Sequence, residues 1–308
     1  MDSVGQVTSE TEILAGPTLD DDALGAVVGL LERAEQVDAA PALNEAGRLA
    51  LRRSRSGTSH LRAVRDGTLV GYAQLDDGPA GSTGQVVVDP PARRRGVGAA
   101  LVAALRARSG QPLHVWAVGN TPAAAGLARR SGLRPVRTLL VMTRSLADLP
   151  APVLPAGVRI DTFDPAVDGP AWLAVNRRAF AHHPEQGAIT ADDLADRVRQ
   201  PWFDPDGFFL ARSTDSPDAG LLGFHWTKQH GGGLGEVYVI GVDPAAEGRG
   251  LAKALLLHGL AYLRARGNAT VELYVEADSA RAVGLYESRG FAVASRDVMY
   301  GDPVSVEG

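Results

Sequence analysis

A short glycine-bearing segment, residues 247–250, has the composition of a phosphate-binding loop, Glu-Gly-Arg-Gly. An apolar, β-branched run precedes it over residues 237–242, and apolar residues at helical spacing follow it at Leu251, Leu255, Leu256, Leu260 and Leu263. Glycine lets the backbone approach an anion closely, and the first turn of a helix presents free N–H groups and the positive end of its dipole. The segment therefore predicts a strand, a loop and a helix that hold a phosphate or pyrophosphate group.

The loop has a counterpart earlier in the chain. Val242 and Gly250 follow Val88 and Gly96 at one offset (242 − 88 = 250 − 96 = 154), and the earlier loop carries arginine at residues 93–95. A second pair of similar segments, 126–133 and 284–291, repeats at an offset of 158. A repeat of domain size predicts two similar lobes. We call residues 1–147 the N-terminal lobe and 158–308 the C-terminal lobe, joined by the proline-containing linker 148–157.

Strand-like and helix-like patterns mix within each lobe, so we expect an α/β fold with mixed (α+β) sheets. Three aspartates at 20–22 predict the start of a helix that reaches about Ala39, and Asn44 predicts the start of a second helix through Arg53. Residues 78–84 predict a loop before a strand over 85–88, and residues 229–235 predict a glycine-rich turn.

Two motifs in the C-terminal lobe resemble those of the GNAT superfamily of N-acetyltransferases. Val242, Glu247, Gly250 and Ala252 are spaced as in its pyrophosphate loop, and a second motif follows with Ser279, Ala282, Tyr286 and Gly290-Phe291. Two positions depart from the family pattern, because Glu247 replaces the usual Gln or Arg and Ser279 replaces the usual Asn. The resemblance implies two tandem acyltransferase lobes that use acetyl-CoA as co-substrate.

The resemblance also implies which segments would bind the coenzyme. In the N-terminal lobe they are Val86, Val87, Val88, Arg94, Arg95, Gly96, Val97, Gly98 and Ala99. In the C-terminal lobe they are Ile240, Gly241, Val242, Glu247, Gly248, Arg249, Gly250, Leu251, Ala252, Lys253, Ser279, Ala280, Arg281, Ala282, Val283 and Gly284.

Acetyl transfer to an amine needs a base and gains from an acid. A free α-amino group, with a pKa of roughly 8, is mostly protonated at neutral pH and must lose a proton before it attacks a thioester. Glu236, at the start of the strand that leads to the loop, is the candidate base, and Tyr286 is the candidate donor to the departing thiolate. Backbone N–H groups near 240–242 could stabilise the oxyanion. The chain has no cysteine, so direct attack is the simplest mechanism.

The two lobes differ in this chemistry. At the offsets of the repeat, Glu236 corresponds to Ser82 and Tyr286 corresponds to Ala128. The N-terminal lobe therefore keeps a phosphate-binding loop but lacks a base and an acid. We expect the C-terminal lobe to be the catalytic one and the N-terminal lobe to be inactive.

Further segments of the C-terminal lobe resemble the mycothiol synthase family of tandem GNAT proteins. They are residues 180–187, 202–207, 223–228 and 235–239. That resemblance implies acetylation of the cysteinyl amine of a cysteine–glucosamine–inositol pseudodisaccharide, the last step of mycothiol biosynthesis. It also implies Glu236 as base, Tyr286 as acid, and substrate contacts from Glu45, Glu185, Lys228, Glu236 and Tyr274.

Composition limits the remaining classes of function. The chain has 308 residues, a net charge of −5 and no cysteine, which argue against a nucleic-acid surface, disulfides and thiolate metal sites. The N-terminus lacks the basic region and apolar core of a signal peptide. We expect a cytoplasmic monomer that binds neither a metal nor a membrane and acts on a small molecule.

Other interpretations stay open at this level. The enzyme could acetylate another small amine or a protein N-terminus, or the chain could be a non-enzymatic acyl-CoA sensor. Glu236 could be a carboxylate at a strand edge and Tyr286 a packed aromatic residue. Glu45 could simply be an acid at a helix N-terminus, where the dipole favours it.

Overall fold

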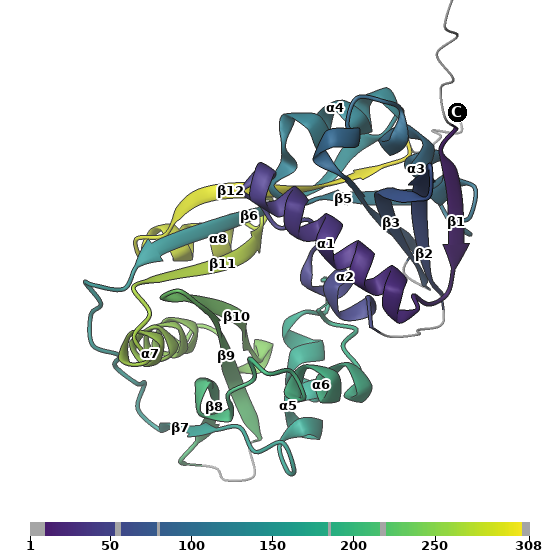
Figure 1. Ribbon diagram of the computed structural model, residues 1–308. Coiled ribbons are helices and arrows are strands. Elements are labelled where there is room, and N and C mark those ends of the chain that lie inside the picture. Colours follow the sequence, from purple (N-terminus) through teal and green to yellow (C-terminus); the bar gives the residue numbers. More distant parts are fainter. Residues whose placement is uncertain (1–9, 53–56, 79–80, 184–185, 216–219, 304–308) are drawn as a thin grey trace, which may run out of the picture. The chain divides into compact units, whose positions relative to one another are not determined.

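The computed structural model describes residues 10–52, 57–78, 81–183, 186–215 and 220–303 (Figure 1). Contacts divide the chain into two compact units. The first unit comprises Met1–Leu140, Glu276–Asp278 and Ser295–Gly308, and the second comprises Val141–Val275 and Ser279–Ala294. Each unit combines strands and helices, in agreement with the predicted α/β class.

The sheet of the first unit has the strand order β1-β2-β3-β4-β5-β12. Its strands are β1 (Glu12–Gly16), β2 (Thr58–Arg65), β3 (Thr68–Gly78), β4 (Gly81–Val88), β5 (Leu113–Ala117) and β12 (Ala292–Gly301). Neighbours are antiparallel except for the parallel pair β4 and β5. The end of β12, Val298–Gly301, pairs with residues 114–117 of β5, so the C-terminal strand belongs partly to the first unit.

Helices cover both faces of this sheet. They are α1 (Asp21–Asp38), α2 (Glu45–Ala50), α3 (Val97–Arg106) and α4 (Pro122–Arg130). Successive strand residues point to opposite faces, so Tyr72 of β3 packs in one core with α1, and its neighbour Ala73 packs in another with α3. Asp20 accepts a hydrogen bond from the Ala23 N–H and Asn44 accepts one from the Gly47 N–H, which confirms both predicted helix starts.

The sheet of the second unit contains the order β11-β10-β9-β8-β7. Its strands are β7 (Val158–Thr162), β8 (Phe208–Ser213), β9 (Leu221–Gly231), β10 (Leu234–Val242) and β11 (Thr270–Glu276), and β6 (Arg134–Ser145) precedes them in the chain. The helices are α5 (Gly169–Ala179), α6 (Ala191–Val198), α7 (Leu251–Ala265) and α8 (Ala280–Glu287). Short 3-10 helices are η1 (Pro90–Ala92), η2 (Val118–Asn120), η3 (Pro205–Gly207) and η5 (Pro244–Ala246).

Both units contain one parallel strand pair that separates part-way along. β4 pairs with β5 only over residues 82–85 and continues to Val88. β10 pairs with β11 only over residues 234–237 and continues to Val242. The second unit adds a β-bulge, because Tyr238 is an extra residue between the pairs that Val237 and Val239 make with β9. A bulge leaves backbone groups outside the ladder and redirects side chains, and the β3–β4 register shows no such shift.

Three boundaries differ from the sequence prediction. α2 ends at Ala50, before the predicted end at Arg53. β4 begins at Gly81, within the predicted loop, because residues 81–84 pair with residues 75–78 of β3. Glycine is needed at 84, where a Cβ would lie 2.9 Å from Leu105 Cδ1 of α3. β9 extends to Gly231, into the predicted turn. Among the described residues, no helix has both the length and the apolarity needed to cross a membrane.

The packing of α7 on β9 depends on a histidine that must stay neutral. His225 is fully buried, and its Nδ1 donates to the Leu255 carbonyl oxygen at 2.8 Å. A Cβ at Gly259 would lie 2.2 Å from the imidazole Cε1, so glycine is required there. Burial lowers the pKa of His225 to about 4, and the nearby His258 acts in the same direction, while the carbonyl contact opposes it.

We predict that acid weakens the second unit through His225. An unfolded imidazole gains a proton below a pKa of about 6.5, whereas the folded His225 resists protonation until its pKa of about 4. Stability should therefore fall between these values as the pH drops, by at most about 1.4 kcal/mol per pH unit. His225→Gln should flatten this dependence, and His182→Gln, at an exposed position, should not.

The measurement is the unfolding midpoint from pH 4 to 7.5, followed by the fluorescence of the buried Trp172 and Trp226. An equal pH slope in the parent and in His225→Gln would contradict the prediction.

Candidate active site

The candidate base lies in a row of charged side chains on three adjacent strands. Glu236 of β10 is opposite Lys228 of β9 and opposite Glu272 of β11. Residues directly opposite one another project from the same face of a sheet. The Lys228 Nζ lies 3.9 Å from the Glu236 Oε2. Glu236 is only 6% exposed, so these neighbours rather than water surround its carboxylate.

A histidine completes the surroundings of Glu236. The His230 Nε2 lies 2.6 Å from the Glu236 Oε2 and 3.5 Å from the Glu272 Oε1. Because a carboxylate only accepts, the imidazole donates to Glu236 from Nε2. His230 is the extra residue of a second irregularity in the β9–β10 ladder, between the pairs formed by Gly231 and Gln229. The sequence analysis placed this residue in a turn and missed it.

Aromatic rings hold the Lys228 ammonium beside Glu236. The Nζ lies 4.5 Å from the Trp202 ring centre and 5.1 Å from that of Tyr238, both within cation–π range. Tyr238 is fixed in turn, since its hydroxyl accepts a hydrogen bond of 2.9 Å from the Arg197 Nε of α6. Trp202, Tyr238 and Arg197, which the sequence analysis did not select, therefore position Lys228, a predicted substrate contact.

The remaining predicted site residues occupy different environments. Tyr274 lies two residues after Glu272 on β11, hence on the same face, and is 43% exposed. Glu45 is the first residue of α2, in the first unit, directly after the Asn44 cap. Glu185 lies outside the described residues.

The candidate acid is enclosed. Tyr286 lies on α8, is buried, and packs edge-on against Phe291 with ring centres 5.7 Å apart. Burial raises the pKa of Tyr286 to about 12. A phenol with this pKa keeps its proton at neutral pH and can donate it.

The glycine loop of the second unit leads into α7 with the expected geometry. Gly250 precedes α7 with a φ of 76°, in the left-handed region that favours glycine, and no side chain caps the helix. The first N–H groups of α7 therefore face an open position where an anion can bind. The Arg281 Nη1 lies 2.9 Å from the Glu247 Oε2, which brings the start of α8 to the loop.

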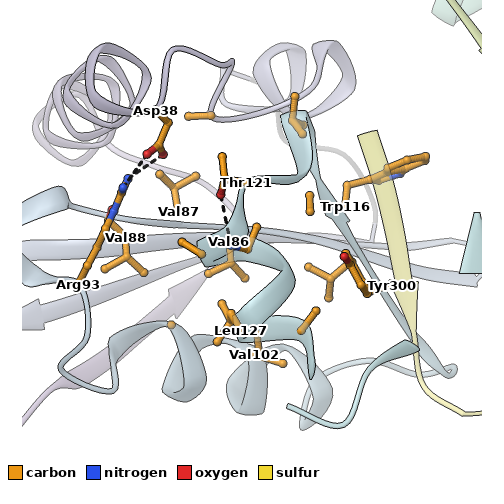
Figure 2. Close-up of a pocket in the computed structure, with 18 of the residues that line it drawn as sticks. Asp38, Val86, Val87, Val88, Arg93, Val102, Trp116, Thr121, Leu127 and Tyr300 are labelled. Atoms are coloured by element: carbon orange, nitrogen blue, oxygen red, sulfur yellow. Dashed lines mark hydrogen bonds and ion pairs between the residues drawn. The ribbon is translucent and has the colours of Figure 1, made fainter. Parts of the chain in front are cut away.

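The first unit encloses a cavity of about 490 Å³ at the corresponding place (Figure 2). Of the predicted coenzyme residues, Val86, Val87, Val88, Arg94, Gly96, Gly98 and Ala99 line it, whereas Val97 is in the core. Tyr300 of β12 forms part of the wall. Beside the cavity, Arg93 is held by Asp38 at 2.6 and 2.8 Å.

The position that matches the base has a structural role in this unit. Ser82 is fully buried, donates to Asp77 on the opposite strand, and accepts from the Gln111 N–H at 3.1 Å. Ala128, which matches Tyr286, is a wall residue of the cavity. These two residues supply neither a carboxylate nor a phenol.

Comparison with known proteins decides the family. The model of the acetyltransferase (GNAT) family matches residues 28–132 and again 175–291. The chain belongs to this family. The predicted fold class, with two tandem GNAT lobes, and the predicted enzyme class, an acetyl-CoA-dependent N-acetyltransferase, are confirmed.

Relatives match this GNAT protein over nearly its whole length. It is 49% identical to a mycothiol acetyltransferase of Thermomonospora curvata, over 96% of this chain and 98% of that protein. It is 50% identical to one of Catenulispora acidiphila, over 88% and 92%. The crystal structure of a GCN5-related N-acetyltransferase from Sphaerobacter thermophilus shares 25% identity and a TM-score of 0.69, over 94% and 95%. A tandem GNAT protein from the clavulanic acid biosynthesis pathway has the same fold, with 22% identity, a TM-score of 0.72, and coverage of 96% and 100%.

We predict that Glu247→Gln strengthens acetyl-CoA binding to the C-terminal lobe. The Glu247 carboxylate lies at the loop where the coenzyme phosphates are expected to bind, and it forms an ion pair with Arg281. Its removal should increase the affinity by about two- to fivefold, the range of one surface charge near a helix N-terminus. Isothermal titration calorimetry measures this, with Glu287→Gln at the exposed far end of α8 as the control of equal charge. Weaker binding by Glu247→Gln would show that the carboxylate positions Arg281 for the coenzyme.

Proposed function

We propose that the chain acetylates the cysteinyl amine of a cysteine–glucosamine–inositol pseudodisaccharide with acetyl-CoA, the last step of mycothiol biosynthesis. The observation that carries the chemistry is the buried Glu236 carboxylate, held by His230 and Lys228 at the point where β10 leaves β11. The substrate class follows from relatives at about 50% identity that carry the name mycothiol acetyltransferase.

In the proposed reaction, Glu236 accepts a proton from the substrate ammonium, and the neutral amine attacks the thioester carbonyl. The C–N bond forms, the C–S bond breaks, and Tyr286 donates its proton to the leaving sulfur. The acylated nitrogen then loses its surplus proton to the Tyr286 phenolate, so one proton per turnover remains on Glu236. Backbone N–H groups around the bulge at Tyr238 and along residues 240–242 would stabilise the oxyanion. Burial keeps Tyr286 protonated at neutral pH, so its phenol is present to donate when the sulfur departs.

The polar groups suit a polyhydroxylated substrate with a cationic amine. Lys228, Glu272 and Tyr274 project from the face that carries Glu236, and they offer donors and acceptors for hydroxyl groups. We propose Glu45, Glu185, Lys228, Glu236 and Tyr274 as the substrate contacts. We also propose that the enzyme acts as a cytoplasmic monomer.

The division of labour between the lobes is part of the proposal. The N-terminal lobe, residues 1–147, would bind coenzyme in its cavity. It would not catalyse the transfer, because Ser82 stands in the position of the base and Ala128 in that of the acid. The C-terminal lobe, residues 158–308, would catalyse the transfer, with coenzyme on residues 240–242, 247–253 and 279–284.

We predict that Glu236→Gln folds and binds acetyl-CoA but loses most turnover. The amide cannot accept the proton, so kcat should fall by about a hundredfold or more, and the deficit should shrink at high pH, where more of the amine is already neutral. The assay is release of CoA thiol with the pseudodisaccharide and with a panel of other amines. An unchanged kcat and pH profile would remove Glu236 from the mechanism, and a preference for another amine would overturn the substrate.

We predict that charge reversal in the N-terminal loop abolishes one acetyl-CoA binding event and leaves most activity. Arg94→Glu/Arg95→Glu changes two exposed arginines at the loop that precedes Gly96, whose φ of 85° makes substitution of the glycine itself unsuitable. The matched variant, Arg249→Glu/Lys253→Glu, should abolish the other event and the activity. Calorimetry and the thiol assay together test both. Loss of activity in the first variant, with the second binding event intact, would refute the division of labour.

A further inference from the structure

Glu236 needs a route by which it returns its proton. In the proposed function each turnover leaves one proton on this carboxylate, and the inference below rests on that role. The Glu236 side chain is 8% exposed, so water has little direct access to it. A base that cannot lose its proton supports only a single turnover.

We infer that His230 carries the proton from Glu236 to solvent. Its Nε2 is within hydrogen-bond distance of the Glu236 Oε2, at 2.6 Å, and its side chain is 31% exposed. It therefore connects the buried carboxylate to water. Imidazole suits this task because it exchanges protons near neutral pH and has two ring nitrogens. When Glu236 is protonated, Nε2 of the Nδ1–H tautomer accepts its proton and Nδ1 releases one to water, which leaves Nε2–H to donate to the ionised Glu236. Exchange with water at the exposed ring restores the Nδ1–H tautomer for the next turnover.

The charged neighbours favour transfer in this direction. The Lys228 ammonium of β9 lies 3.9 Å from the Glu236 Oε2, so it is a positive charge beside the base. The Glu272 carboxylate of β11 lies 3.5 Å from the His230 Nε2, so it is a negative charge beside the imidazole. The carboxylates of Glu236 and Glu272 carry two negative charges, and the Lys228 ammonium carries one positive charge. A protonated His230 makes this cluster of four side chains neutral.

The backbone aims the imidazole at Glu236. His230 is the additional residue of the irregular β9–β10 hairpin, and an extra strand residue redirects its side chain. In the first unit the β3–β4 ladder is regular to its end, at Gly78 opposite Gly81, and Asp77 stands opposite Ser82. The relay is therefore a property of the second unit, where the proposed base is.

The same side chains could also hold a divalent cation. His230, Glu236 and Glu272 each offer a ligand atom within 4.8 Å of the others. However, the Lys228 ammonium would face such an ion, and the short contact between His230 and Glu236 is already a hydrogen bond. The geometry therefore favours a proton relay over a metal site.

The test separates relay from structure by chemical rescue. In dilute buffer, His230→Ala and His230→Gln should lower kcat at least about tenfold, with the KM for the pseudodisaccharide within about twofold of the parent. Added imidazole should restore kcat in His230→Ala, where the side chain has left space, and the parent should not respond. Glu236→Gln should not be rescued.

The outcomes distinguish failure of the relay from failure of the proposed function. An unchanged kcat and pH profile in both His230 variants, with Glu236→Gln inactive, would overturn the relay and leave the proposed function intact. A loss that appears in KM and resists imidazole would assign His230 a structural role and also overturn the relay. An active Glu236→Gln would overturn the proposed function itself. Inactivation of the parent by EDTA, reversed by zinc, would show that the cluster is a metal site instead.

Discussion

The central constraint on this protein is the burial of one carboxylate. An ionised carboxyl group removed from water is costly unless charges and hydrogen-bond donors replace the solvent. For Glu236 the replacements come from its own sheet, since His230 and Lys228 lie on β9. Neither would face Glu236 without the antiparallel register of β9 and β10. The carboxylate and the strand register therefore depend on each other.

The aromatic side chains around this sheet serve the same constraint. Trp172 and Trp226 are fully buried and pack edge to face, which gives the second unit a rigid wall. Trp202 and Tyr238 extend that wall to Lys228, and their rings hold its ammonium beside Glu236. The first unit shows the alternative, in which the Ser82 hydroxyl at the matching position donates to Asp77 on the opposite strand.

Much of this architecture is readable from the sequence, because it depends on local patterns. Three kinds of feature depend only on neighbouring residues: glycine at a helix start, the repeated loop, and the Asp20 and Asn44 caps. The structure places them as predicted. Glu236 was a candidate because of its position on a strand. The partners of Glu236 were not predictable in the same way. His230 reaches Glu236 through an irregular ladder, and Trp202 reaches Lys228 from a distant segment. Local periodicity carries no information on either contact.

The shared C-terminal strand means that the repeat in the sequence is not a boundary along which the chain can be cut. A polypeptide that ends near the linker would lack β12, so β5 would lose its antiparallel neighbour and the cavity would lose Tyr300. The exposed strand edge would invite association with other chains. The last residues of the chain therefore complete the sheet of its first unit, so folding of that unit needs the whole polypeptide.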